Sequence, residues 1–356
     1  MTSQAQESLI RQPASLDERV ITPASGDPTL STSASQLLPG VSVVIPVFNS
    51  AQSLPELIAR TIATMKTRGQ SFEMILVNDG SSDESWHVIR QLASRHRFIR
   101  GISLMRNYGQ HNALVAGLRA ARYELSATLD DDLQHPPEEL GRLLDWLDQG
   151  YDVVYGTPER ERRALWRSLA SQFTRLAIGG VMGAETARKI SAFRVLRTGL
   201  RVAFDRYTSP FVSLDVILTW GTSRFGAVRV PHQPRSSGRS NYTLSKLVSH
   251  AINLMTGFST LPLRLASVVG FVCAGFGVCT LGYVMIRFFI IGRAVPGFAF
   301  LAAIISIFSG AQLFALGLIG EYLAKMHFRL MEKPLYVIAE ICSQPDEPQQ
   351  PESGAL

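Results

Sequence analysis

The sequence is poor in cysteine, and its three cysteines stand in no paired or metal-binding spacing. Cys273 and Cys279 lie within apolar sequence, and Cys342 follows far along the chain. We therefore expect neither a disulfide framework nor a zinc-binding cysteine motif. Because disulfide frameworks belong to oxidising compartments, the soluble part of the chain is expected in a reducing, cytoplasmic setting.

Two common nucleotide-binding motifs are also missing. No Gly-x-Gly-x-x-Gly follows the first predicted strand, and no Gly-x-x-x-x-Gly-Lys-[Ser/Thr] occurs anywhere, which disfavours a dinucleotide fold and a P-loop. The formal net charge of +6 suits a nucleic acid, a membrane surface or a phosphorylated ligand. Aromatic and basic residues form no interleaved stripe, so no nucleic-acid partner is expected.

The two ends of the chain have the composition of disordered segments. Residues 1–39 are rich in Ser, Thr, Pro, Gln and Ala and poor in aromatic residues, which predicts a disordered N-terminal tail. This tail has no apolar core flanked by positive charge, so we do not expect a signal peptide. The residues after Ser343 are expected to be equally unstructured.

Two long runs without a charged residue stand near the C-terminus, at 265–286 and 294–320. Each run is long enough to cross a hydrocarbon core of roughly 30 Å. We predict a transmembrane hairpin over 264–325, with spans at 265–286 and 297–320, in the inner (plasma) membrane. The alternative is a pair of buried helices in a soluble core. Small residues in both runs favour close helix packing and a homo-oligomer.

Basic residues set the predicted orientation of this hairpin. Arg264, Lys325, Arg329 and Lys333 flank the side of the two chain termini, which favours a cytoplasmic catalytic domain in a multi-pass protein. Segment 241–263 carries apolar residues at helical spacing and is expected to form an amphipathic interfacial helix or to pack against the soluble domain. Residues 326–356 are predicted to form a cytoplasmic C-terminal segment and tail.

Between the tail and the hairpin, apolar β-branched runs alternate with helical patterns. Strands are predicted at 41–49, 72–83 (ending in a polar turn), 101–106, 125–129 and 152–155, and helices at 53–67, 84–94, 110–121 and 137–149. Such alternation predicts an α/β domain over 40–240, with a mostly parallel sheet and helices on both faces.

Polar residues gather where three of these strands end. Asp130, Asp131 and Asp132 follow one strand, and a helix start with two prolines comes directly after them. Adjacent carboxylates repel each other, so a divalent cation that holds a diphosphate is one interpretation. A solvated turn in which Asp132 caps the helix is the other. Asn49 and Asp79 end two further strands at the same predicted edge, although Asp79 alone also suits a plain turn.

Four motifs occur in order at fitting distances: Pro46-Val47-Phe48-Asn49, Asn78-Asp79-Gly80-Ser81-Ser82-Asp83, Arg106-Asn107-Tyr108-Gly109-Gln110-His111 and Asp130-Asp131-Asp132-Leu133-Gln134. Together with the hairpin, they make the chain resemble a family-2 glycosyltransferase of the polyprenyl-phosphate (undecaprenyl- or dolichyl-phosphate) sugar transferase type. The resemblance covers about 41–338.

The resemblance implies a nucleotide-sugar-binding domain of the GT-A type. It also implies inverting transfer from a nucleotide-diphosphate sugar, a UDP-sugar by expectation, to polyprenyl phosphate in the bilayer, for a cell-envelope glycan or lipid modification. The implied nucleotide-sugar contacts are Pro46, Val47, Asn49, Asp79, Arg106 and Asp131, with Asp131 nearer the ribose than the metal. The implied ligands of Mg²⁺ or Mn²⁺ are Asp130, Asp132 and Gln134, the first two also counted as catalytic.

The acceptor phosphate is already an oxyanion near neutral pH, so the site needs cations more than a strong base. The resemblance assigns catalytic roles to Arg162, Arg194 and Arg235, and lipid-phosphate binding to Arg162, Arg235, Arg239 and Ser240. Two positions depart from the family. Asn241 replaces a lysine, and Ala192 replaces an aspartate, which leaves Asp215 or no base at all. The alternatives are a different acceptor, or a membrane protein that binds a nucleotide sugar without turnover.

Overall fold

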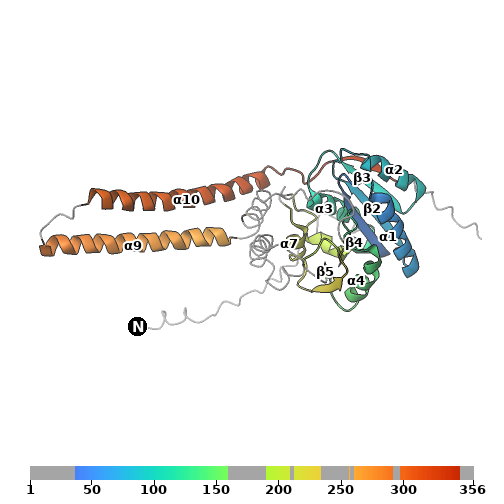
Figure 1. Ribbon diagram of the computed structural model, residues 1–356, viewed down its shortest axis with the longest axis horizontal. Coiled ribbons are helices and arrows are strands. Elements are labelled where there is room, and N and C mark those ends of the chain that lie inside the picture. Colours follow the sequence, from blue (N-terminus) through green and yellow to red (C-terminus); the bar gives the residue numbers. More distant parts are fainter. Residues whose placement is uncertain are drawn as a thin grey trace, which may run out of the picture. The chain divides into compact units, whose positions relative to one another are not determined.

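The computed structural model describes residues 37–158, 190–208, 212–233, 256, 260–291 and 297–344. The first of these ranges alternates strand and helix (Figure 1). Its elements are β1 (Leu38–Val47), α1 (Leu54–Arg68), β2 (Phe72–Asn78), α2 (Ser85–Arg95), β3 (Ile99–Leu104), α3 (Gln110–Ala120), β4 (Tyr123–Thr128), the 3₁₀ helix η2 (Pro137–Glu139), α4 (Leu140–Leu147) and β5 (Val153–Pro158). All nine elements predicted between residues 41 and 155 are present.

The elements that follow were not predicted from the sequence. They are β6 (Arg194–Arg197), the 3₁₀ helix η3 (Thr198–Ala203), α7 (Leu214–Leu218), β7 (Phe225–Val230) and, after two long helices, β8 (Ile338–Cys342). The described strands form one sheet in the order β7-β5-β6-β4-β1-β2-β3-β8. β1 is parallel to β2 and β4, β2 is parallel to β3, and β5 is parallel to β7, whereas β6 and β8 run antiparallel to their neighbours. The sheet is therefore mostly parallel, as predicted.

The central strand β1 is buried on both faces. Val43 and Ile45 belong to the hydrophobic layer of α1, α2 and α4, while Val44 belongs to the layer of α3 and α7. Gly117 lets α3 lie close to the sheet, because a Cβ atom there would come within 2.3 Å of a methyl group of Val44. This close contact fixes α3 against the strand ends at which the polar motifs lie.

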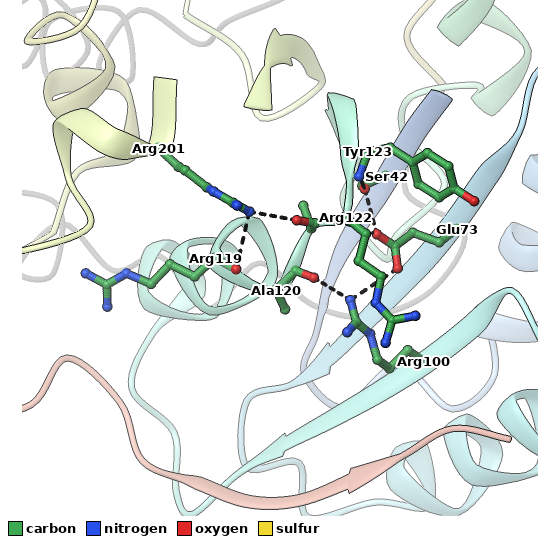
Figure 2. Close-up of polar contacts among 9 residues, drawn as sticks. Ser42, Glu73, Arg100, Arg119, Ala120, Arg122, Tyr123 and Arg201 are labelled. Atoms are coloured by element: carbon green, nitrogen blue, oxygen red, sulfur yellow. Dashed lines mark hydrogen bonds and ion pairs between the residues drawn. The ribbon is translucent and has the colours of Figure 1, made fainter. Parts of the chain in front are cut away.

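The C-terminal end of α3 is held by arginines from neighbouring elements (Figure 2). Arg201 donates from Nη1 to the carbonyl oxygen of Ala121 at 2.7 Å, and Arg100 donates to that of Ala120. Arg100 in turn pairs with the buried carboxylate of Glu73 at 3.1 Å. The last carbonyl groups of a helix lack partners within it, so these contacts complete its hydrogen bonding.

Two helices long and apolar enough to cross a membrane follow the sheet domain. They are α9 (Leu261–Ile291) and α10 (Phe298–Leu330), and their candidate spans are Pro262–Arg287 and Ile307–Leu330. Neither span is buried within the protein, which disfavours the alternative of soluble core helices. At about 1.5 Å per residue, α10 is roughly 50 Å long, more than a bilayer core requires. It continues ten residues past the predicted span end at Gly320.

After α10 the chain returns to the sheet domain. Leu335 is buried in the layer of α3 and α7, and β8 then pairs with β3. The backbone N–H of Met105 donates to the carbonyl oxygen of Val337 at 2.9 Å, and the indole N–H of Trp86 donates to Glu340 at 3.0 Å. The C-terminal segment is thus partly built into the sheet of the α/β domain.

Several predictions fall on residues outside those described. They concern the N-terminal tail up to residue 36, most of the amphipathic helix predicted over 241–263, the residues after 344, and four predicted site residues, Arg162, Arg235, Arg239 and Ser240. At the N-terminal boundary, β1 already begins at Leu38, so it includes the last two residues of the tail predicted over 1–39. These predictions remain expectations from the sequence.

Candidate active site

The loop after β1 is tied to the loop after β2. Pro46 and Val47 are buried at the end of β1, and Asn49 then adopts a left-handed backbone with φ of 54°. The backbone N–H of Asn49 donates to Ser81 Oγ at 3.0 Å, and the backbone N–H of Ser82 donates to Asn49 Oδ1 at 2.8 Å. Asparagine tolerates this backbone better than most residues. Asn49 therefore suits the turn, and its side chain also bonds the loop after β2.

Asp79 organises the loop that follows β3. Its carboxylate accepts the backbone N–H groups of Tyr108 at 2.7 Å and Gly109 at 2.8 Å. The side chain is buried with its residue only 2% exposed, and this burial raises the pKa of Asp79, against the lowering effect of the two backbone bonds. Gly80, with φ of 67°, is needed beside it, because a Cβ atom would meet the backbone of Arg106 at 2.5 Å. The predicted role of Asp79 in nucleotide binding stays a prediction.

Asp131, the middle aspartate, joins the loop after β4 to the loop after β1. Its Oδ2 accepts the backbone N–H of Phe48 at 2.9 Å and the hydroxyl of Ser50 at 2.5 Å, and Ser53 Oγ donates to its carbonyl oxygen at 2.6 Å. Burial raises the pKa of Asp131, while the bonds from Ser50 and Phe48 lower it. The side chain therefore connects the predicted nucleotide loop with the predicted metal loop.

Asp130, Asp132 and Gln134 lie in one tight turn. Leu133 is buried and adopts a left-handed backbone with φ of 59°, an uncommon conformation that tends to occur at functional sites. The turn brings the backbone N–H of Gln134 to 3.1 Å from Asp132 Oδ1. Asp130 Oδ1 accepts a hydrogen bond from Gln110 Nε2 at 2.6 Å. Gln110 is the first residue of α3, so this helix contributes directly to the loop.

The donor set of this turn fits a hard divalent cation. Two carboxylates and one carboxamide offer oxygen atoms, the ligands that Mg²⁺ and Mn²⁺ prefer. Among the described residues, no group of three or more His, Cys, Asp or Glu side chains is placed to hold a metal ion. A cation bound by few protein ligands is typical of sites in which substrate phosphates complete the coordination. The N-cap residues of η2 and α4, Pro136 and Glu139, make no side-chain cap hydrogen bond, and Asp132 accepts the backbone N–H of Gln134 within its own turn, so both interpretations of Asp132 stay predictions.

The two predicted arginines within the described residues lie in different environments. Arg106 is exposed on the loop after β3, where its guanidinium stands 4.7 Å from the ring centroid of Tyr108. Arg194 is only 2% exposed and pairs with the buried carboxylate of Asp215. The hydroxyl of Tyr155 also donates to Asp215, at 3.0 Å, and burial raises the pKa of that tyrosine.

This buried group changes how Arg194 and Asp215 are understood. The charge of Arg194 is balanced inside the protein, and Asp215 already accepts two hydrogen bonds. A carboxylate held in this way is poorly placed to remove a proton from an acceptor. The structure therefore favours the mechanism without a base over a base at Asp215, while the catalytic role of Arg194 stays a prediction.

The loop over Asp130–Gln134, the predicted metal loop, also contacts the chain beyond β7. The ring of His135 stacks on Phe193 with centroids 5.4 Å apart and lies 5.0 Å from the ring of His232. The backbone N–H of Gln233 donates to the carbonyl oxygen of Gln134 at 2.9 Å. Burial, and then the neighbouring His232, lower the pKa of His135 to about 4. His135 is thus a neutral packing residue of this loop.

Sequence reasoning missed two residues of this network. Gln110 stands in the motif Arg106–His111, and its place as the first residue of a predicted helix was the available signal. Ser50 follows Asn49 at the end of a quoted motif, yet nothing in the sequence indicates that its hydroxyl reaches a residue 81 positions away.

Residues 42–199 match the family model described as glycosyl transferase family 2. The chain is 37% identical over 320 residues to an undecaprenyl-phosphate 4-deoxy-4-formamido-L-arabinose transferase of Edwardsiella ictaluri, which covers 87% of this chain and 97% of the relative. A protein of the same name from Proteus mirabilis is 38% identical over 85% of this chain and 93% of its own length. Both matches extend well beyond the catalytic sheet.

Solved structures give a more distant likeness. The glucosyl-3-phosphoglycerate synthase from Mycobacterium tuberculosis, crystallised with Mn²⁺, UDP and glucosyl-3-phosphoglycerate, is 17% identical, with a TM-score of 0.45 over 61% of this chain and 78% of that chain. The S. aureus protein TarS, residues 1–349, in complex with UDP-GlcNAc, is 16% identical, with a TM-score of 0.40 over 62% and 74%. Likenesses this distant carry no argument about function.

Proposed function

Since the chain belongs to glycosyl transferase family 2, we propose that it transfers a sugar from a nucleotide-diphosphate sugar to polyprenyl phosphate. The transfer inverts the anomeric carbon and yields a lipid-phosphate-linked sugar for modification of the cell envelope. The supporting observation is the near full-length match to enzymes named as undecaprenyl-phosphate sugar transferases, joined to the carboxylate turn at the sheet edge. A UDP-sugar is the proposed donor.

In this proposal the donor binds across the loops after β1, β2, β3 and β4. Asp130, Asp132 and Gln134 would hold a Mg²⁺ or Mn²⁺ that neutralises charge on the departing nucleoside diphosphate. Asp79 and Asp131 keep the surrounding loops in place through backbone hydrogen bonds. Donors and acceptors that are fixed before the reaction need no rearrangement as charge develops, which is the main source of electrostatic catalysis.

The acceptor half of the proposal needs no general base. A phosphate monoester has its second ionisation near pH 6, so the attacking oxygen is already charged at neutral pH. Cationic side chains then have to bind and orient the phosphate behind the anomeric carbon. Arg162, Arg235, Arg239 and Ser240 are the proposed groups.

One assay tests the whole proposal. Membranes that contain the full chain receive polyprenyl phosphate, Mg²⁺ or Mn²⁺ and a panel of labelled nucleotide sugars, including the 4-deoxy-4-formamido-L-arabinose donor suggested by the relatives' names. The expected result is a labelled product extractable into organic solvent. No such product with any donor would overturn the proposal. Product formed with a non-polyprenyl acceptor alone, or donor binding without turnover, would establish the alternatives from the sequence.

We also propose that the hairpin spans the inner membrane twice, with both termini in the cytoplasm. The two candidate spans and the basic residues near their cytoplasmic ends, Arg264 and Arg329 among them, support this orientation. Labelling of single cysteines in intact and permeabilised cells tests it. A cysteine placed at Ser343 should react only after permeabilisation, whereas one placed at Gly292 should react from outside.

A further inference from the structure

The catalytic domain exposes an aromatic and apolar face at η3 and α7. Val202 is 76% exposed and Trp220 is 49% exposed, although both are large hydrophobic residues. The ring of Tyr207 meets that of Trp220 edge-on at 5.4 Å, and Arg206 is exposed beside them. We call these four residues the Trp220 face.

The chain that leaves the second candidate span lands on the same layer. Leu335, only five residues after the end of α10 at Leu330, is buried with Phe204 and Leu218 in the hydrophobic cluster of η3 and α7. Five residues reach at most about 18 Å when fully extended. The layer that carries the Trp220 face is therefore tied within about 18 Å of the C-terminal end of α10, the helix that carries the second candidate span.

Arg119 strengthens this connection. Its Nη2 donates to the carbonyl oxygens of Phe204 at 3.0 Å, Asp205 at 2.7 Å and Tyr207 at 3.1 Å, and its guanidinium stands 5.8 Å from the ring centroid of Tyr336. Figure 2 shows this guanidinium directed away from the cluster around Glu73. One side chain thus holds the η3 turn and the returning segment together.

We propose that the Trp220 face lies in the headgroup layer of the bilayer that holds the hairpin. Tyrosine and tryptophan concentrate at membrane interfaces, because each combines an apolar ring with a polar group. Val202 would enter the outer edge of the hydrocarbon, and Arg206 would meet lipid phosphates. The occupant is the lipid surface itself, and its chemistry matches this mixture of aromatic, apolar and cationic side chains.

Hydrogen bonds through α3 connect the Trp220 face to the proposed metal loop, Asp130–Gln134. The backbone N–H of Leu214, the first residue of α7, donates to His111 Nδ1 at 3.3 Å. His111 follows Gln110 in α3, and Gln110 bonds Asp130. Contact between the Trp220 face and lipid would therefore set the height of the catalytic edge above the membrane. That consequence rests on the proposed function, whereas the lipid contact itself does not.

Tryptophan fluorescence in bilayers tests the contact without any substrate. The full chain and its Trp220→Phe variant are placed in nanodiscs of plain lipid, or of lipid brominated near the headgroup end of its acyl chains. The difference between the two proteins reports Trp220 alone. We expect brominated lipid to reduce this difference signal at least twofold, and an equal signal in both lipids would overturn the proposal.

Trp146 provides a matched control. It is 36% exposed and stacks on Tyr151 at 5.9 Å, yet α4 belongs to the hydrophobic layer on the opposite face of the sheet. The difference signal from Trp146→Phe should be the same in both lipids. Equal quenching of Trp146 and Trp220 would overturn the proposal, because it would show general access of lipid to the domain.

A kinetic comparison links the contact to its consequence. Trp220→Ser should raise the KM for polyprenyl phosphate several-fold in bilayers, leave the KM for the donor unchanged, and have a smaller effect in detergent. An increase in the donor KM alone would contradict the role proposed for this face. Because quenching is measured without turnover, failure of the lipid contact and failure of the transferase activity remain distinguishable.

Discussion

The two ends of α3 are held by groups of opposite charge. At its start, the carboxylates of Asp79 and Asp130 accept hydrogen bonds from Gly109 and Gln110. At its end, Arg100 and Arg201 donate to the last carbonyl groups (Figure 2). Both arrangements complement the helix macrodipole, whose positive end is the N-terminus.

The two ends of α3 differ in how far their polar side chains are exposed to solvent. Gln110 is exposed and Asp130 is partly exposed at the start of α3, whereas Glu73 at the far end is buried and shared among three donors. A polar network that is closed and buried stabilises the fold, whereas one that reaches solvent is available to a ligand. Substitutions at the start should therefore change activity, and substitutions at the far end should change stability.

The largest effect at the exposed start of α3 is expected for Asp132→Asn, in the loop that contacts this helix through Asp130. The change keeps the shape of the side chain but removes a charge needed to hold a divalent cation, so we expect turnover to fall at least about 100-fold. Mn²⁺ affinity, measured directly on the purified chain, should weaken in parallel while the midpoint of thermal unfolding is retained. Full activity in this variant would remove the metal role from Asp132.

The corresponding test of the buried network at the C-terminal end of α3 is Glu73→Gln. Glu73 Oε1 accepts from Ser42 Oγ and from the backbone N–H of Arg122, both at 2.7 Å, and Oε2 accepts from Arg100. Loss of its charge removes the ion pair between Glu73 and the partly buried guanidinium of Arg100, which costs about 2–4 kcal/mol of unfolding free energy.

Thermal unfolding of the two proteins measures this loss, and the remaining folded protein should keep most of its specific activity. Glu56→Gln is the control, because its pair with Arg60 is exposed and contributes less than about 0.5 kcal/mol. Equal unfolding midpoints for Glu73→Gln and the wild type would refute the structural role of this network.

The sequence predicts the first half of the sheet well and the second half poorly, for a physical reason. Strands such as 41–49 are continuous apolar runs, because helices cover both faces of a parallel sheet. β6 has arginine at both ends, Arg194 and Arg197, and β8 is exposed along most of its length. Such short strands form because a neighbouring strand pairs with them. The partner of β8 is β3, which lies more than 200 residues earlier in the chain.

The same limit applies to the candidate site. The motifs indicated loops that the structure brings together, whereas the ligand roles of the residues in the turn around Leu133 stay predictions. They did not indicate that Asp131 bonds Phe48 and Ser50, or that Arg194 is neutralised by Asp215, because both contacts join distant segments. Residue types at strand ends are readable from sequence, whereas the direction of each side chain depends on the packing of neighbouring loops.

A smaller effect is expected for Gln110, the helix residue that reaches the metal loop. Gln110→Ala removes the donor at 2.6 Å from Asp130 but preserves helix propensity, so unfolding should change by less than about 0.5 kcal/mol. The Mg²⁺ or Mn²⁺ concentration for half-maximal activity should rise about three- to ten-fold. Gln110→Glu, which places a second negative charge beside Asp130, should shift this requirement in the opposite direction, because an added carboxylate attracts the cation. An identical metal requirement in the wild type and both variants would show that α3 does not contribute to the metal site.

The smallest predicted effect is the pH dependence of stability that Asp79 contributes at the start of α3. Burial raises the pKa of this carboxyl above its ordinary value of 3.8. The folded state therefore binds the proton more readily than the unfolded state. The resulting stabilisation is complete below the unfolded pKa and is lost as the pH rises through the raised folded pKa. Asp79→Asn cannot titrate, so the unfolding midpoint of the wild type relative to this variant should fall as the pH increases above about 4, measured in parallel buffers. A difference that grows with pH would mean that the two backbone donors of Tyr108 and Gly109 outweigh burial, and that the start of α3 favours the charged carboxylate.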